Sequence, residues 1–317
     1  MPTLIIAMES DPNTFDFYTT DPVQHAYSFI TDSLKYPHAD TRQIAKKALE
    51  ISNKCLEAWL LLAQSYQKFP QARTTYLKGI EVAREQDTTS TLLQLLYGLG
   101  ELYYRHGHPE SAIETILELL PLDESDPCNA REILTLSYLQ QEDFIKAHAC
   151  ATHSSYDDSL SSRVAQAYIA FRTEIPWWTP DQMDQLDDEL LGRTTWQWMH
   201  EQCNSLKRLY RQINHANPFF AAFMLNPHAQ SIETPTTIES KHASEALHVT
   251  KLHHDLWHNQ ELPIKLLEEF PWTNPTKSQI KAADKPILLE TIQQLEKHRD
   301  AQRSAAEKDY LQNRDLY

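Results

Sequence analysis

Apolar side chains recur every three to four residues along most of this chain. In the segment SSRVAQAYIAF, residues 161–171, Val164, Ala167, Tyr168 and Phe171 fall on one face of a helix. Residues 195–216 have a similar spacing and are followed by a proline at position 218, which ends helices. The pattern predicts a series of amphipathic helices.

The sequence also repeats over a longer distance than one helical turn. In YGLGELYYRHGHPESAIETILELL, residues 97–120, Leu99, Gly100, Tyr103, Gly107 and Ala112 have the spacing of a helix–turn–helix unit. Glycine and alanine let two helices approach closely, the tyrosine fills the space behind them, and the second glycine allows the turn. The segment predicts two antiparallel helices.

Similar units precede and follow this one. About 35 residues further on, Leu134, Tyr138 and Ala147 occupy the corresponding positions. The preceding unit has a shorter turn and carries the residues Trp59, Leu62, Ala63 and Tyr66. Three units in register indicate a repeat protein, because one match arises easily by chance and three do not.

These motifs resemble the tetratricopeptide repeat over residues 38–172. The resemblance implies an all-α, right-handed helical solenoid, which here would be closed by a helical C-terminal cap. In that family the first helices of successive repeats line a concave groove that binds a segment of another protein. The family's clamp for a terminal carboxylate needs Lys, Asn and Arg, and this chain has Leu60 and Gln64 at the first matching positions. Chaperone-tail binding is therefore not expected.

The remaining sequence divides into four further regions. Residues 1–37 are expected to be a leader or capping helix, and residues 173–225 degenerate helical repeats with an acidic segment at 181–189. Residues 226–243 are polar and predict a loop. Residues 244–317 predict a helical C-terminal region that begins with a helix from about Ser244 to His258.

Part of the C-terminal region has a second, looser resemblance. Asn217 and Pro218, then Glu245, Ala246 and Trp257, together with the later Pro263, are similar to the tail of bacterial tetratricopeptide proteins related to the suppressor-of-tumorigenicity group. Ile264 and Lys265 replace the small residues usual after that proline. The resemblance implies architecture only and brings no catalytic residues.

Composition excludes several classes of protein. Only 5 of 317 residues are glycine, which disfavours nucleotide-binding folds that need glycine where the backbone approaches a phosphate. The net charge of −15 disfavours nucleic acid and anionic membranes as partners. The four cysteines lie far apart without a CxxC motif, and no secretory signal or long apolar run is present. A cytoplasmic protein without a cofactor is expected.

One motif raises the question of metal chemistry. In HDLWH, His254 and His258 lie one helical turn apart, as in the zinc-binding HExxH motif. However, Asp255 replaces the catalytic glutamate, and no third ligand is marked, although Glu261, Glu268 or Glu269 could serve. Trp257 is expected to be buried. The pair is interpreted as structural, with a metal-dependent hydrolase as the alternative.

The positions between the packing residues predict the partner-binding groove. They carry amides, aromatic rings and charges in three successive first helices, namely Gln64, Gln94, Tyr97, Glu101, Tyr104, Arg105, Asn129, Glu132 and Gln140. Tyrosine and arginine are typical anchors of interfaces, and the two glutamates suggest a partner segment with basic character.

The sequence therefore predicts a non-catalytic interaction scaffold that binds an extended or helical segment of another protein. A hydrolase built on His254 and His258 is the first alternative. A purely architectural protein that self-associates is the second. The sequence does not identify the partner or the oligomeric state.

Overall fold

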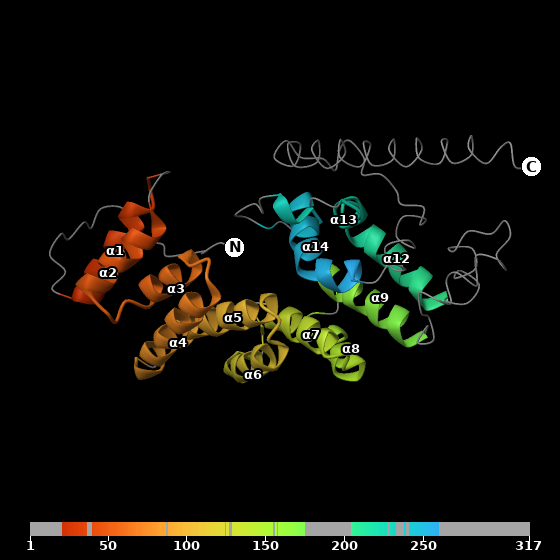
Figure 1. Cartoon of the computed structure of the whole chain (residues 1–317), viewed down its shortest axis with the longest axis horizontal. Coiled ribbons are helices and arrows are strands. Elements are labelled where there is room, and N and C mark those ends of the chain that lie inside the picture. The colour runs from red at the N-terminus through yellow and green to blue at the C-terminus, as the bar shows by residue number, and fades with distance from the viewer. Residues whose placement is uncertain are drawn as a thin grey trace, which may run out of the picture. The chain divides into compact units, whose positions relative to one another are not determined.

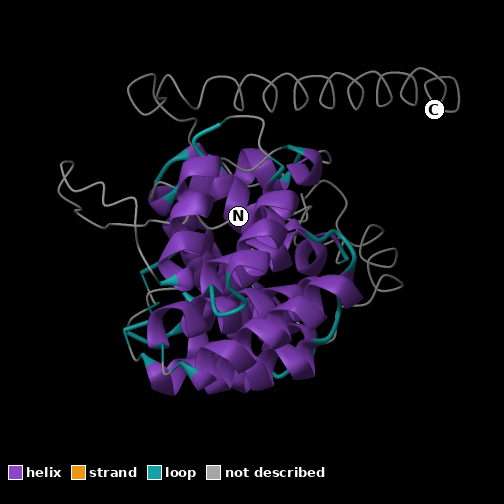
Figure 2. Cartoon of the chain, turned by 90° about the vertical axis from the view of Figure 1, so that its left-hand side faces the viewer, coloured by secondary structure: helices purple, strands orange, loops and turns teal. Residues whose placement is uncertain are grey.

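The structure is a computed structural model, and it describes residues 21–36, 40–86, 88–123, 125–126, 129–154, 156, 158–174, 204–226, 229–232, 238 and 241–259. Every regular element in these ranges is a helix (Figures 1 and 2), which confirms the prediction of an all-α protein. The leader up to residue 20, the acidic segment 181–189 and the tail after residue 259 lie outside the described ranges. No described helix is long and apolar enough to cross a bilayer.

The described helices form two compact units, the first of which ends at Tyr156. Its helices follow one another in chain order (Figure 1) and are α1 (Pro22–Ser33), α2 (Thr41–Ile51), α3 (Leu56–Ser65), α4 (Phe69–Glu85), α5 (Thr89–Arg105), α6 (Pro109–Leu119), the short 3₁₀ helix η1 (Leu120–Leu122), α7 (Ala130–Gln140) and α8 (Phe144–Ala151). Each α-helix packs against the next one in the chain. In addition, α1, α3, α5 and α7 contact one another in that order, so the odd-numbered helices form a layer of their own.

Local chemistry fixes where these helices begin. The carboxylate of Asp40 accepts hydrogen bonds from the backbone N–H groups of Arg42 and Gln43 at 3.0 and 3.2 Å. Asp21 and Asp143 cap α1 and α8 in the same way. Such caps satisfy N–H groups that have no partner within the helix. Proline stands in the first turn of α1, α4 and α6, where its missing N–H costs nothing.

Two turns of the first unit have the same backbone geometry 35 residues apart. After α5, Gly107 has φ +71°, and the N–H of His108 donates to the carbonyl of Tyr103 at 3.0 Å. After α7, Glu142 has φ 58°, and the N–H of Asp143 donates to the carbonyl of Tyr138 at 3.0 Å. The sequence period is thus matched by a repeated left-handed turn at the helix end.

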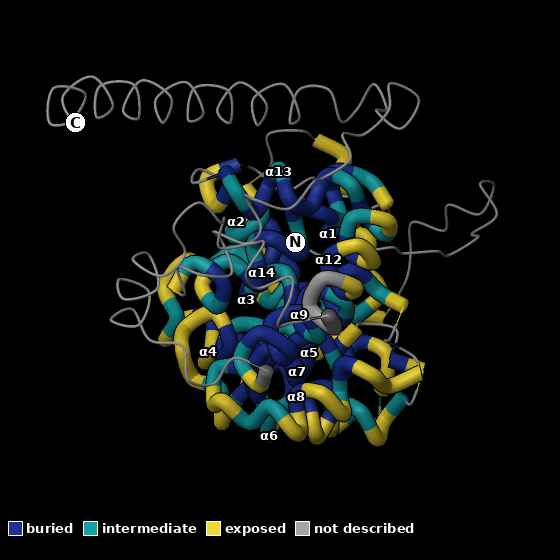
Figure 3. Tube along the Cα trace, turned by 90° about the vertical axis from the view of Figure 1, so that its right-hand side faces the viewer, coloured by how far each residue is buried: buried dark blue, intermediate teal, exposed yellow. Residues whose placement is uncertain are grey.

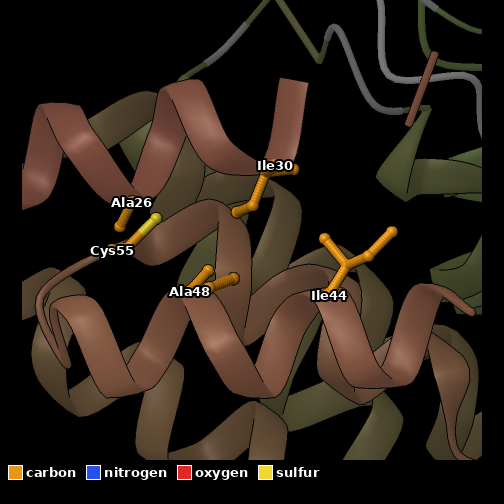
Figure 4. Close-up of a cluster of buried hydrophobic side chains, with 6 residues drawn as sticks. Ala26, Ile30, Ile44, Ala48 and Cys55 are labelled. Carbon is orange, nitrogen blue, oxygen red and sulfur yellow. The ribbon is translucent and has the colours of Figure 1, made fainter. Parts of the chain in front are cut away.

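Small side chains bring the first three helices together. Figure 4 shows Ala26 and Ile30 of α1 facing Ala48 and Ile44 of α2, with Cys55 beside them. Ala26, Ala48 and Cys55 have no exposed surface. This cluster is the apolar core of the N-terminal end of the stack.

The close contact between α5 and α6 depends on Gly100. A Cβ atom built at this position would lie 2.6 Å from Cδ1 and 2.9 Å from Cγ1 of Ile116. Ala112, on the same face of α6, is fully buried. In the structure, Gly100 and Ala112 thus lie where α5 and α6 approach each other closely.

The second unit contains α9 (Leu160–Glu174), α12 (Asn204–Ala216), α13 (Phe220–Met224), the 3₁₀ helix η2 (Ala229–Ser231) and α14 (Ala243–His258). The predicted helix from about Ser244 to His258 is confirmed as α14. Helix α9, which we had expected to continue the repeats to residue 172, packs against α12 and α14. Trp257 of α14 lies against the apolar face of α9, with its ring 6.3 Å from that of Tyr168 between centroids.

Trp257 is the centre of the second unit. Its ring is 1% exposed and lies 6.1 to 6.3 Å, between centroids, from the rings of Tyr168, Tyr210 and Phe220. These three residues come from α9, α12 and α13, so one side chain of α14 joins all four helices. The expectation that Trp257 is buried is confirmed.

Asn217 fixes the path of the chain in the same unit. It is fully buried, and its Nδ2 atom donates to the carbonyl of His242 and to the Glu245 carboxylate, both at 2.9 Å. Its Oδ1 atom accepts from the N–H of Phe219 at 3.1 Å. Asn217 and Glu245 therefore connect the start of α13 with the start of α14, and they do so as structural residues.

Candidate partner-binding surface

Most of the residues predicted to pack the repeats are buried in the structure. Nine of the twelve are buried, which are Leu62, Ala63, Leu99, Gly100, Tyr103, Ala112, Leu134, Tyr138 and Ala147. Gly107 is exposed in its turn. Trp59 and Tyr66 are half-buried. The Trp59 indole N–H donates to the carbonyl of Asn53 at 2.8 Å, and the Arg42 guanidinium lies 4.9 Å from the centre of the Tyr66 ring.

The nine residues predicted to line a groove separate into two groups. Tyr97, Tyr104 and Glu132 are 8%, 5% and 5% exposed, so these side chains offer no surface to a partner. The reason is the packing of the odd-numbered helices: α5 is buried on most of its circumference, and α7 buries every residue from 132 to 139, polar residues included. The other six residues remain partly or fully accessible, namely Gln64, Gln94, Glu101, Arg105, Asn129 and Gln140.

Helix α7 shows this burial most clearly. Residues 132–139 are all buried, so the helix is covered on every face (Figure 3). The accessible positions lie at its two ends, at Asn129, which precedes the helix, and at the half-buried Arg131 and Gln140. A helix of three turns with no exposed middle acts as core, although Glu132, Thr135 and Ser137 are among its buried residues. Accessible polar positions therefore lie mainly on α3 and α5 and at the two ends of α7.

The two accessible charges of this group neutralise each other. The Nε and Nη2 atoms of Arg105 both donate to Oε1 of Glu101, at 2.9 and 2.7 Å. The side chain of Arg105 is 48% exposed and that of Glu101 is 18% exposed. Burial lowers the pKa of Arg105, but the charge and hydrogen bonds of Glu101, together with the nearby Tyr97 and Tyr104, raise it by more, so the guanidinium stays charged. The local surface is consequently polar with little net charge.

The face thus consists mainly of carboxamides. Gln64, Gln94, Asn129 and Gln140 each carry one carbonyl acceptor and one NH₂ donor, although the Oε1 atom of Gln140 is buried and is not accessible to a partner. A peptide backbone presents the same two groups in every residue except proline. Chemically, these residues can hydrogen-bond to the backbone of an extended segment whatever its side chains are.

The histidine pair of α14 is held by contacts within the protein. The rings of His254 and His258 stack with centroids 4.1 Å apart and planes inclined by 22°. The Nε2 atom of His258 donates to the carbonyl of Met224 at 2.9 Å, and Nδ1 of His254 lies 3.1 Å from Oδ1 of Asp255. His258 therefore connects the end of α14 to the end of α13. Desolvation lowers the pKa of His258, which favours the neutral imidazole.

The stacking of these two rings matters for the alternative that they bind one metal ion. The lone pair of an imidazole nitrogen lies in the ring plane, and two nearly parallel planes do not direct their lone pairs to one ion. Among the described residues, no three His, Cys, Asp or Glu side chains come together as a metal site requires. Glu261, Glu268 and Glu269 lie outside the described ranges.

Sequence reasoning missed one group of side chains at the turn that follows α5. Phe69, the first residue of α4, lies 4.8 Å from the His106 ring and 4.9 Å from the His108 ring, between centroids. Arg73 lies beside them and donates from Nε to the hydroxyl of Tyr103 at 2.8 Å. The sequence signal was the run RHGH at 105–108, in which the prediction uses Arg105 and Gly107 and assigns no role to the two histidines.

The comparisons with known proteins leave the family open. No family model matches the chain, and no curated protein or solved structure is significantly similar to it.

Proposed function

We propose that this protein is a non-catalytic scaffold of the tetratricopeptide type, whose odd-numbered helices bind an extended segment of another protein. The observation that carries the proposal is the repeated unit in the first half of the chain. Tyr103, Gly107 and Ala112 have counterparts 35 residues later in Tyr138, Glu142 and Ala147, with the same turn geometry. Stacked units of this kind bind partners through a preformed surface, so the ordering cost falls mainly on the ligand.

The accessible carboxamides on α3, α5 and α7 would be the contacts. They support recognition of the partner's backbone, as in other peptide-binding domains that use main-chain hydrogen bonds for affinity. The basic character expected of the partner rests on Glu101 alone, because Glu132 is buried. Since Glu101 already binds Arg105, we propose that charge plays a small part on this face.

The proposal includes a reducing, cytoplasmic location. Cys55 and Cys150 are free thiols, and burial raises the pKa of Cys55 to about 11. Burial is also the main reason why the pKa of Cys150 is raised. Thiols with a raised pKa react slowly with oxidants and metals, which suits a structural role.

Site-specific photo-crosslinking in the source cell tests the proposal. A photoreactive amino acid would replace Gln94 on α5 in one variant and Lys78 on α4 in another, since both side chains are exposed. We expect a protein adduct from Gln94 that is absent from Lys78. A second variant, Gln94→Arg, should then weaken binding of the purified partner about tenfold, which is the effect of losing roughly 1.4 kcal/mol.

Two results would contradict the proposal. Adducts that are the same from both positions would indicate non-specific contact. A Gln94 adduct that contains only a second copy of this chain would indicate self-association in place of partner binding. Circular dichroism of each variant would establish that the helices are intact.

A further inference from the structure

A cluster of aromatic and cationic side chains lies at the turn edge of the first unit. We call it the edge cluster and define it as Phe69, Arg73, Tyr103, His106 and His108. The Phe69 ring makes an edge contact with Tyr103 at 6.0 Å and stacks on His108 at 4.9 Å with planes inclined by 27°. Arg73, His106 and His108 are exposed. The aromatic contacts hold the two imidazoles in place beside the guanidinium.

The cations of the edge cluster have no carboxylate partner among the described residues. Arg84, Arg105 and Arg131 of the same unit each form an ion pair. In contrast, the hydrogen bond from Arg73 Nε to the Tyr103 hydroxyl leaves both of its terminal nitrogens for another acceptor. Lys68, next to Phe69, is also exposed and forms no ion pair in the described part of the chain.

Two glutamates, Glu101 and Glu110, flank the turn after α5 in the sequence. Glu101 is bound to Arg105. Glu110 is exposed on α6, two residues beyond His108, and forms no ion pair with any described residue, so its negative charge is felt locally. Lys68 and Arg73 nevertheless outnumber this one unpaired carboxylate, although the chain as a whole carries a net charge of −15.

A similar contact precedes the cluster along the stack. The Arg42 guanidinium lies 4.9 Å from the centre of the Tyr66 ring, and that of Arg73 lies 5.9 Å from the centre of the Tyr103 ring. In both cases the arginine belongs to an even-numbered helix and the tyrosine lies at the end of the following odd-numbered helix. The guanidinium of Arg42, however, is half-buried and donates to the carbonyl of Ser65, so Arg73 is the arginine of the two whose terminal nitrogens are left for a partner.

We propose that the edge cluster binds a segment of a partner protein that is rich in aspartate and glutamate. A guanidinium with two unused nitrogens fits a carboxylate, and the imidazoles add N–H donors. The high negative charge of the whole chain repels long polyanions, whereas a short acidic segment meets mainly the local positive charge. This surface lies at the turns and does not depend on the proposed contacts of Gln64 and Gln94.

Fluorescence anisotropy with a short fluorescein-labelled poly-glutamate peptide tests the proposal. We expect saturable binding at low ionic strength that weakens at about 0.15 M salt because of screening. Arg73→Gln should weaken binding about tenfold, as expected for one charge-assisted hydrogen bond. The matched control is Lys78→Gln, which removes the same charge from another exposed position of α4 and should change the affinity less than about twofold.

A second variant guards against a folding defect. The double substitution His106→Gln/His108→Gln leaves the bond between Arg73 and Tyr103 in place and should also weaken binding. The proposal is overturned if the peptide does not bind, or if Lys78→Gln reduces the affinity as much as Arg73→Gln. It is equally overturned if a short oligothymidylate binds as tightly as the peptide, because the surface would then be a general polyanion site.

Discussion

The contact between Gly100 and Ile116 makes a sharp prediction about helix packing. In the substitution Gly100→Ala, the new methyl group would lie 2.6 and 2.9 Å from two carbons of Ile116. Carbon atoms in contact are normally separated by about 3.5 to 4.0 Å. Ile116 is fully buried, so it has little room to move away.

The magnitude follows from two opposing effects. Alanine in place of glycine favours the helix by about 1 kcal/mol. Overpacking in a well-packed core costs about 1 to 3 kcal/mol. We therefore expect Gly100→Ala to lower the free energy of unfolding by up to about 2 kcal/mol.

The effect should change sign when Ile116 is shortened. Ile116→Ala alone costs about 2 to 5 kcal/mol, because it leaves a cavity. In that background the close carbons are gone, and the Ala112 carbonyl at 3.9 Å is the other contact of a methyl group at position 100. There, Gly100→Ala should raise the free energy of unfolding by about 1 kcal/mol.

Urea unfolding of the four proteins of this double-mutant cycle, followed by circular dichroism, measures the coupling. Hydrogen exchange of the α5 and α6 amides would locate the change. Gln94→Ala, at an exposed position of α5, is the control and should be additive with Ile116→Ala. If Gly100→Ala has the same effect in both backgrounds within about 0.5 kcal/mol, the close contact does not limit the packing of α5 on α6.

Three further predictions concern single sites. Gly107→Ala places a methyl group in open space at φ +71°, so backbone strain alone should lower the free energy of unfolding by about 1 kcal/mol. Glu142→Gly, at φ 58°, relieves such strain and should raise the free energy of unfolding by about 0.5 kcal/mol. Urea midpoints that shift in the same direction for both variants would contradict this prediction. Because the pKa of His258 is lowered in the folded state, the unfolded chain binds more protons, and the stability should fall as the pH drops below about 6.5. His258→Gln can still donate to the Met224 carbonyl and should remove this contribution to the pH dependence in thermal melts from pH 8 to 5. Asn217→Asp puts a carboxylate where the buried amide donates two hydrogen bonds. We expect calorimetry to show a free energy of unfolding lower by at least about 3 kcal/mol, and a much smaller decrease for Asn259→Asp at an exposed position.

The sequence located most helices in the described ranges because the responsible interactions are local. Side-chain periodicity placed α14 to within one residue at its start. The two left-handed turns at Gly107 and Glu142 lie 35 residues apart, the spacing that the sequence pattern predicts between neighbouring units. These are properties of neighbouring residues and can be read without knowing what packs against them.

Accessibility could not be predicted in the same way. Tyr97, Tyr104 and Glu132 were assigned to a groove by their register, yet they are buried. Register gives the direction in which a side chain points from its helix. It does not give the number of neighbours in that direction, which depends on how all the helices pack.

The histidines of α14 show the same difference between what the local sequence predicts and what the packing decides. The sequence drew attention to His254 and His258 because they match a metal-binding spacing. The structure instead buries His253 completely, with its Nε2 atom 2.8 Å from the Ser161 hydroxyl, 92 residues away in the chain. No local pattern encodes a pairing of that separation.

The sequence by itself determined that the described chain is helical and placed left-handed turns 35 residues apart, because these features follow from the residues within one or two turns. Only the tertiary structure decided that α9 packs with α12 and α14, that α7 is core, and that Arg73, His106 and His108 meet around Phe69. Those outcomes depend on long-range burial of apolar surface, in which each helix competes for the faces of all the others.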